Sequence, residues 1–233
     1  MNTIVIGIDP GLTGGISILD DGALSAYKIP VRPIVVNKKK KNTYDMVEII
    51  KLFSSYRSKQ VLFIIEKQNV RPKEGGVSAM TIGKNYGQLL GAAFAFCFDV
   101  VEIASQKWKK HFPELMSKGI IDKKEEIKKL KSLLKEELGK LEEIGKTLKD
   151  KKAKKLNKEQ IKILSKENIK ETDKLARQVK AEAKTNAREL AAKLYPKIAD
   201  SFEKKNTDGV AESVLIALYA NANYDKMIQD NEK

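Results

Sequence analysis

Two strongly apolar runs in this sequence each end in an acid. Residues 4–8 lead into Asp9 and residues 61–65 lead into Glu66. Such runs are typical of buried strands, where a carboxylate is costly to desolvate unless a cation meets it. Asp9 is followed at once by a Pro-Gly break and a Gly-Gly pair. The acid therefore either holds a metal ion, or marks a glycine turn that binds a phosphate.

The pattern around these runs predicts an α/β protein. Asp21-Gly22 is a strong signal for a type I′ hairpin between two strands. Residues 32–42 are expected to be a basic connection, with Asn42 or Thr43 capping the helix that follows. Ser105 is the expected cap of a later helix. Strands are expected at 3–9, 15–20, 23–30, 60–68 and 99–105, and helices at 42–57, 77–96, 105–112, 183–196 and 207–224.

A lysine-rich segment interrupts this pattern from about residue 118 to 182. It carries 21 Lys+Arg against 13 Asp+Glu and contains no aromatic residue and no proline. Ile127, Leu134, Leu141 and Leu148 recur every seven residues, with Leu130 and Ile144 at intermediate positions. A turn is expected near residues 149–157, followed by a capping box from Asn157 to Gln160. The segment is therefore predicted to be an inserted helical hairpin.

Three roles remain open for this hairpin. It is a DNA-binding arm, a clasp between two copies of the chain, or a solvated appendage. The domains expected are a core at 1–117 and 183–225, the hairpin at 118–182, and a polar tail at 226–233.

Composition excludes several classes of protein. The net charge of +14 favours a polyanionic partner. One cysteine, expected to be buried, rules out a disulfide framework, and one histidine leaves little for a zinc site or a Ser-His-Asp triad. No run reaches the ~18 apolar residues of a membrane span, and no secretory signal is evident. A cytoplasmic protein without membrane contact or organic cofactor is expected, with any catalysis built from carboxylates.

Four acids are the candidates for that chemistry. Asp9 and Glu66 end strands, whereas Asp208 and Glu212 lie four residues apart on one face of the last helix. Converging carboxylates repel one another unless a divalent cation binds, and an all-oxygen ligand set suits Mg²⁺ or Mn²⁺. Two such ions about 4 Å apart are a standard device for phosphodiester hydrolysis.

The sequence resembles the RuvC-like Holliday junction resolvases of the ribonuclease H-like superfamily, most closely the phage-type branch. The resemblance covers most of residues 1–113 and 183–222. It is carried by five segments: IGIDPGLTGGISILD, IIEKQNVRPKEGGVSAMTIGKNYGQLLGA, ASQKWKK, KTNARELAAKLYP and DGVAESVLIALY. It implies an α/β fold with a ribonuclease H-like mixed sheet flanked by helices.

The resemblance also implies a function. Asp9, Glu66, Asp208 and Glu212 correspond to the catalytic acids that bind two Mg²⁺ ions, with Mn²⁺ able to substitute. The expected activity is that of a homodimeric crossover junction endodeoxyribonuclease acting on four-way and other branched DNA, in recombination and repair. Candidate DNA-binding residues are Lys67, Gln68, Arg71, Lys73, Lys84, Tyr86, Lys107 and Lys184.

The sequence departs from the family pattern in several places. The long lysine-rich insert is not a feature of the family core, so the resemblance implies no role for it. The final acid pair is spaced by four and ends in Glu212, where bacterial members have a closer pair of aspartates. The aromatic wedge that bacterial members place after the second acid is missing here, unless Tyr86 replaces it. Gly83, Gly87 and Gly91 suggest close helix packing, either within the chain or across a dimer.

Other functions are alternatives to a junction endonuclease. An actin-like ATPase would need a second phosphate turn, which is not found after residue 100. A transposase-type or ribonuclease activity on the same fold, or a non-catalytic nucleic-acid-binding module, are the remaining alternatives.

Overall fold

The computed structural model describes residues 3–36, 38–69 and 75–231, without the side chains of 228–231. These residues form two compact units. The first comprises Met1–Leu115 and Thr185–Lys233, and the second comprises Met116–Lys184. Arg71 and Lys73, two of the candidate DNA-binding residues, lie outside the described part of the chain.

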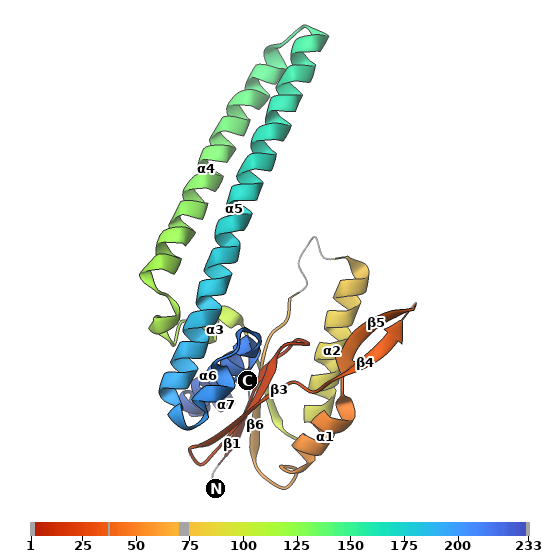
Figure 1. Ribbon diagram of the computed structural model, residues 1–233, viewed down its shortest axis with the longest axis vertical. Helices are drawn as coiled ribbons and strands as arrows, with labels where there is room; N and C mark the ends of the chain where they lie inside the picture. Colours follow the sequence, from red (N-terminus) through yellow and green to blue (C-terminus); the bar gives the residue numbers. More distant parts are fainter. Residues whose placement is uncertain (1–2, 37, 70–74, 232–233) are drawn as a thin grey trace. The chain divides into compact units, whose positions relative to one another are not determined.

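The first unit is built on a five-stranded mixed sheet in the order β3-β2-β1-β6-β7 (Figure 1). Its strands are β1 (Ile4–Asp9), β2 (Gly15–Asp20), β3 (Ala23–Lys28), β6 (Val61–Glu66) and β7 (Asp99–Ile103). The first three strands are antiparallel, whereas β1, β6 and β7 run parallel. Asp21 and Gly22 both have positive φ, as a type I′ turn requires. The predicted mixed sheet of an α/β protein is confirmed.

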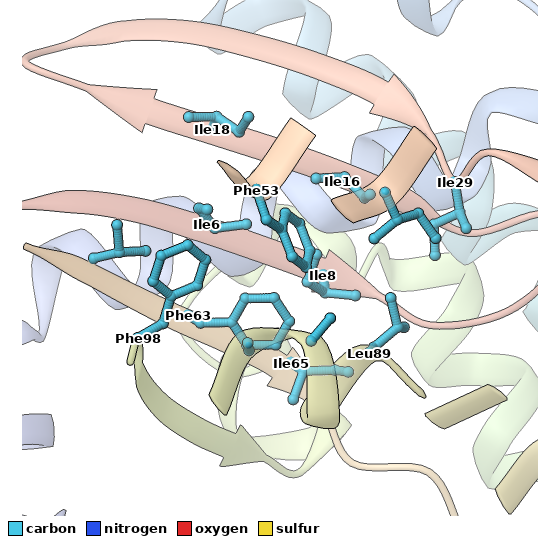
Figure 2. Packing of buried hydrophobic residues seen from close by; sticks show 14 of the residues in the cluster. Ile6, Ile8, Ile16, Ile18, Ile29, Phe53, Phe63, Ile65, Leu89 and Phe98 are labelled. Atoms are coloured by element: carbon cyan, nitrogen blue, oxygen red, sulfur yellow. The ribbon is translucent and has the colours of Figure 1, made fainter. Parts of the chain in front are cut away.

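Alternation along β1 explains how the sheet is covered. Ile4, Ile6 and Ile8 pack with residues of α1 (Met46–Ser54) and α2 (Gly76–Ala95) in one core cluster, part of which Figure 2 shows. Val5 belongs to a second cluster that contains residues of α6 (Asp208–Ala222). Because successive side chains of a strand point to opposite faces, the helices α1 and α2 cover one face and α6 covers the other.

The structure differs from the sequence prediction at residues 31–36 and 39–44. Where a basic connection and a helix start were expected, β4 (Val31–Val36) and β5 (Lys39–Tyr44) form an antiparallel two-stranded sheet. The β-branched content of β4 favours a strand, and its lysine-rich partner is solvated. Helix α1 starts only at Met46, and its N-cap is Asp45 rather than Asn42 or Thr43, since the Asp45 carboxylate accepts from the Glu48 amide.

Smaller differences occur in the other helices. Ser105 is the first residue of α3 (Ser105–Lys109), which has Ala104 at its N-cap. Cys97 is exposed, because the turn that ends α2 places it in the left-handed region with φ 56°. The expected polar tail includes α7 (Tyr224–Asn231), whose Met227 is buried in the second cluster. Short 3-10 helices span Pro113–Leu115, Pro196–Phe202 and Lys205–Thr207.

Glycines allow α6 to approach the sheet very closely. A Cβ atom on Gly7 would lie 2.5 Å from the Ser213 carbonyl oxygen, and one on Gly209 would lie 2.5 Å from the Gly14 Cα atom. The Ser17 hydroxyl bridges the gap by donating to the Ser213 carbonyl at 2.7 Å. Backbone packs on backbone here, so the position of α6 along β1 is tightly fixed.

The second unit is a helical hairpin, formed by α4 (Lys118–Thr147) and residues 151–184 of α5 (Lys151–Leu194) (Figure 1). Asn157 and Asn168 of α5 donate to the carbonyls of Leu141 and Leu130 on α4, at 2.8 and 3.1 Å. The expected capping box is wrong: Asp150 accepts from the Ala153 amide, and Asn157 lies inside the helix.

Two further features of the hairpin differ from the prediction. Ile144, at an intermediate position of the heptad pattern, is expected to pack between the two helices. It is 50% exposed instead, because Gly145 is the residue that faces Asn157. Helix α5 continues without a break through the helix expected at 183–196. Among the described helices, none is both long and apolar enough to cross a membrane.

Candidate metal centre

The carboxyl ends of two neighbouring parallel strands position the first two acids. Ile8 of β1 is in register with Ile65 of β6, so Asp9 and Glu66 follow at the same edge of the sheet. Ligand sites in α/β proteins form at such edges. Helix α6 passes this edge and contributes Glu212, with the Gly14–Gly209 bridge holding its first turn beside the loop after Asp9.

Three of the four predicted acids lie together. One carboxylate oxygen from each of Asp9, Glu66 and Glu212 falls within 4.8 Å of the others, and all three residues are half-buried. Asp208 forms an ion pair with Arg188 of α5. Arg188 also donates to the Thr185 hydroxyl at 3.1 Å. The structure therefore assembles an acid triad and places a fourth acid, one turn before Glu212, against an arginine.

Partners outside the triad orient two of its members. The indole Nε1 of Trp108, a fully buried residue of α3, donates to Glu66 Oε2 at 2.7 Å. The next residue, Lys109, places its ammonium 3.3 Å from Glu212 Oε1. Trp108 thus fixes one oxygen of Glu66, and Lys109 partly balances the negative charge of the triad. Trp108 also belongs to the second core cluster.

A buried tyrosine holds the loop that follows Asp9. The Gly11 amide donates to the Tyr44 hydroxyl at 2.8 Å. Burial raises the pKa of Tyr44 to about 12, against the opposing effect of the Gly11 amide, so the phenol is neutral. Gln68 also contacts this loop, donating to the Pro10 carbonyl at 3.4 Å. The backbone after Asp9 is therefore supported from both β5 and the end of β6.

The described DNA-binding candidates differ in their surroundings. Lys67, Lys84, Lys107 and Lys184 are exposed, whereas Gln68 and Tyr86 are half-buried. The Tyr86 hydroxyl donates to Glu102 at 2.6 Å. Burial, this hydrogen bond and the nearby charges of Glu102 and Glu66 raise the pKa of Tyr86 well above its ordinary value. The Tyr86 hydroxyl is therefore bound to the carboxylate of Glu102 on β7 in this structure.

The donor set of the triad fits a hard divalent cation. Three carboxylates within reach of one another supply only oxygen ligands, which Mg²⁺ and Mn²⁺ prefer and which suit zinc or copper less well. Asp9, Glu66 and Glu212 are the residues that would hold such an ion.

Sequence reasoning missed Trp108, Lys109 and Arg188 as parts of the site. Trp108 and Lys109 occur in QKWKK, where lysines on both sides indicate only a solvated helix. Arg188 lies in a regular amphipathic stretch, and nothing there marks it as the partner of Asp208. These contacts depend on the docking of α3, α5 and α6, which local patterns do not encode.

Comparisons with known proteins give structural neighbours only. A structure of T. thermophilus RuvC in complex with a Holliday junction substrate is 16% identical, with a TM-score of 0.31 over 48% of this chain and 72% of that chain. A second Thermus thermophilus RuvC structure is 21% identical, with a TM-score of 0.30 over 46% of this chain and 67% of that one. No protein-family model and no curated protein matches the sequence.

Proposed function

We propose that this protein is a divalent-metal-dependent endonuclease that cuts four-way DNA junctions and other branched DNA. The observation that carries the proposal is the convergence of Asp9, Glu66 and Glu212 at the carboxyl edge of the sheet. Three half-buried carboxylates gathered around one point repel each other, which costs stability unless the site serves to bind cations. The +14 net charge favours a polyanionic substrate.

Each residue of the centre has a distinct task in this proposal. Divalent ions bound by carboxylates activate water and stabilise the leaving oxygen in phosphodiester hydrolysis. Asp9, Glu66 and Glu212 hold the ions, and Trp108 keeps Glu66 in its orientation. Asp208, paired with Arg188, is proposed as the fourth ligand. Lys109 lies where it can contact a phosphate that approaches Glu212.

The test is cleavage of synthetic DNA. The purified protein is incubated with a four-way junction, a replication fork, an RNA–DNA hybrid and linear duplex, in Mg²⁺ and in EDTA. We expect cleavage of the junction in Mg²⁺ and none in EDTA. Cleavage of the hybrid alone would favour the ribonuclease alternative, and DNA binding without cleavage in either Mg²⁺ or Mn²⁺ would favour a non-catalytic module.

Replacing Trp108 by Phe should weaken metal use. The ring remains apolar, but Glu66 loses the donor that fixes one of its oxygens. Loss of such an outer hydrogen bond typically costs about 10–100-fold in metal affinity or activity. Titrating Mg²⁺ into the cleavage assay should therefore show half-maximal activity at a higher concentration. An unchanged Mg²⁺ dependence, with the protein folded, would contradict the role of Trp108.

We further propose that the protein is a homodimer, because symmetric cutting of a four-way junction needs two active sites. Helix α2 offers a surface for this contact. Met80 and Phe94, which are 78% and 61% exposed, share one stripe of the helix with Gly87 and Gly91. Within the described residues, a Cβ added at Gly83, Gly87 or Gly91 meets no atom within 4 Å. These glycines are therefore available for packing against a second copy.

Gly87→Glu should separate the dimer without harming the helix. Glutamate has a better helix propensity than glycine by about 0.5–1 kcal/mol, yet it places a charge in the middle of the stripe. Sedimentation should show a shift toward monomer and no loss of thermal stability. Gly139→Glu, at an equally open helical position of α4, is the matched control and should leave the association state unchanged. A wild-type protein that is monomeric with and without DNA would overturn this part of the proposal.

A further inference from the structure

The two helices of the hairpin meet along a seam that divides their surfaces into two broad faces. On α4 the inward residues include Ile127, Leu130, Leu134, Leu138 and Leu141, all half-buried among exposed neighbours. On α5 they include Asn157, Ile161, Leu164, Asn168 and Thr172. The hydrogen bonds from Asn157 to Leu141 and from Asn168 to Leu130 fix the register of this seam.

Eight lysines of the hairpin occupy the position that follows a half-buried or buried residue of the seam. In an α-helix the residue after a seam residue lies about 100° to one side, and the residue before it lies to the other side. Because α4 and α5 are antiparallel, the following positions of both helices share one broad face. We call this the basic face; its lysines are Lys124, Lys128, Lys131, Lys135 and Lys146 of α4 and Lys154, Lys158 and Lys162 of α5.

The opposite broad face has a different character. Its large apolar residues are Leu133, Ile144, Leu156 and Ile163, each at least half exposed. Its charges are nearly balanced: Asp122, Glu126, Glu137, Glu167 and Glu171 against Lys129, Lys140, Lys152 and Lys174. Alongside the eight lysines of the basic face, the acids at following positions are Glu142 and Asp173. The excess positive charge of the hairpin is therefore concentrated on one side.

Ion pairs within the described residues do not offset the charge of the basic face. In the part of the chain that the structure describes, none of its eight lysines forms an ion pair, and all eight are exposed. Lysines elsewhere on the hairpin do pair: Lys123 with Glu182 at 2.5 Å, and Lys140 with Glu136 at 2.7 Å. Eight unpaired charges of one sign repel each other, and an external polyanion would relieve that repulsion.

The dimensions of the face suit a nucleic acid duplex. Lys124 and Lys146 are separated by 22 residues of continuous helix, which corresponds to about 33 Å. One turn of B-DNA spans about 34–36 Å. A membrane surface would call for apolar side chains among the lysines, as in interfacial helices. Here most of the exposed Leu and Ile side chains of the hairpin, Leu133, Ile144, Leu156 and Ile163, lie on the other face, whereas Ile121 and Ile169 lie on the basic face.

We propose that the basic face of the hairpin binds the phosphate backbone of a nucleic acid duplex. The inference stands on the charge distribution of the second unit and does not require the metal centre to be catalytic. If the protein is the proposed nuclease, the duplex is an arm of the branched DNA substrate.

The test compares two variants of the full-length protein with equal loss of charge. The face variant carries Lys128→Gln, Lys131→Gln, Lys135→Gln and Lys158→Gln. The control carries Lys129→Gln, Lys140→Gln, Lys152→Gln and Lys174→Gln on the opposite face. Glutamine keeps the helix propensity, and circular dichroism verifies that both variants are folded. Binding of a labelled 30-base-pair DNA duplex is measured by fluorescence anisotropy in EDTA from 50 to 300 mM salt, so cleavage does not enter.

We expect the face variant to lose at least about tenfold in affinity, and its plot of log K against log salt to flatten by about 3–4 units. The control should retain the wild-type slope within about one unit. Equal losses in both variants would show that only net charge matters, and would overturn the proposal. Unchanged binding in the face variant would do the same. So would a face variant that loses binding to phosphatidylserine vesicles but keeps its affinity for the duplex.

Discussion

Asp9→Asn is expected to abolish DNA cleavage while leaving DNA binding intact. The amide keeps the size of the carboxylate but removes the charge that attracts a divalent ion, at the centre of the acid triad. Loss of a single charge-stabilising group in an active site costs about 10²–10³-fold in rate, and loss of a metal ligand should cost at least as much. The phosphate-binding lysines are unaffected, so the affinity for a four-way junction should stay near wild type.

Single-turnover cleavage in Mg²⁺ and anisotropy in EDTA measure the two effects separately. Asp20→Asn is a matched control, because Asp20 ends β2 at the opposite edge of the sheet and is exposed. The control should cut at the wild-type rate. If Asp9→Asn cuts as fast as the control, Asp9 is not a metal ligand and the proposed function loses its main support.

Much of the fold could be predicted from the sequence because its strands are short, apolar and clearly bounded. The parallel pair β1–β6 buries nearly every side chain, which produces the uninterrupted runs that end in Asp9 and Glu66. Asp21-Gly22 fits a type I′ turn because both positions need positive φ. The hairpin of the second unit follows from its heptad pattern.

Residues 31–44 could not be predicted in the same way. The strand β5 reads KKKNTY, which has no alternation of apolar and polar residues. It is a strand because β4 pairs with it and because Tyr44 at its end is buried beneath the loop after Asp9. Tertiary contact overrides local propensity here.

The metal centre likewise has parts that could be predicted from the sequence and parts that could not. Its three clustered acids were among the four selected from sequence, since strand ends and a helix face place them by simple periodicity. The ion pair between Asp208 and Arg188 and the hydrogen bond from Trp108 to Glu66 join segments distant in the chain. The lysines of the basic face are visible in the sequence, but assigning them to one side needed the register set by Asn157 and Asn168.

Gly7→Ala is expected to destabilise the first unit strongly, since Gly7 is where β1 and α6 come closest. The new Cβ would lie 2.5 Å from the Ser213 carbonyl oxygen and 2.7 Å from the Ala217 nitrogen. These are backbone atoms of α6, so the strain cannot be relieved by a change of rotamer. Overpacking of a core costs about 1–3 kcal/mol, and we expect the upper end of this range.

The same strain should also affect the metal centre. Glu212 immediately precedes Ser213, so a shift of α6 away from β1 moves its carboxylate relative to Asp9 and Glu66. We therefore expect a lower urea midpoint together with a higher Mg²⁺ requirement for cleavage. Gly83→Ala, on the open face of α2, is the control; there the substitution should raise stability by about 0.5–1 kcal/mol. Equal midpoints for the two variants would show that α6 does not depend on this close approach.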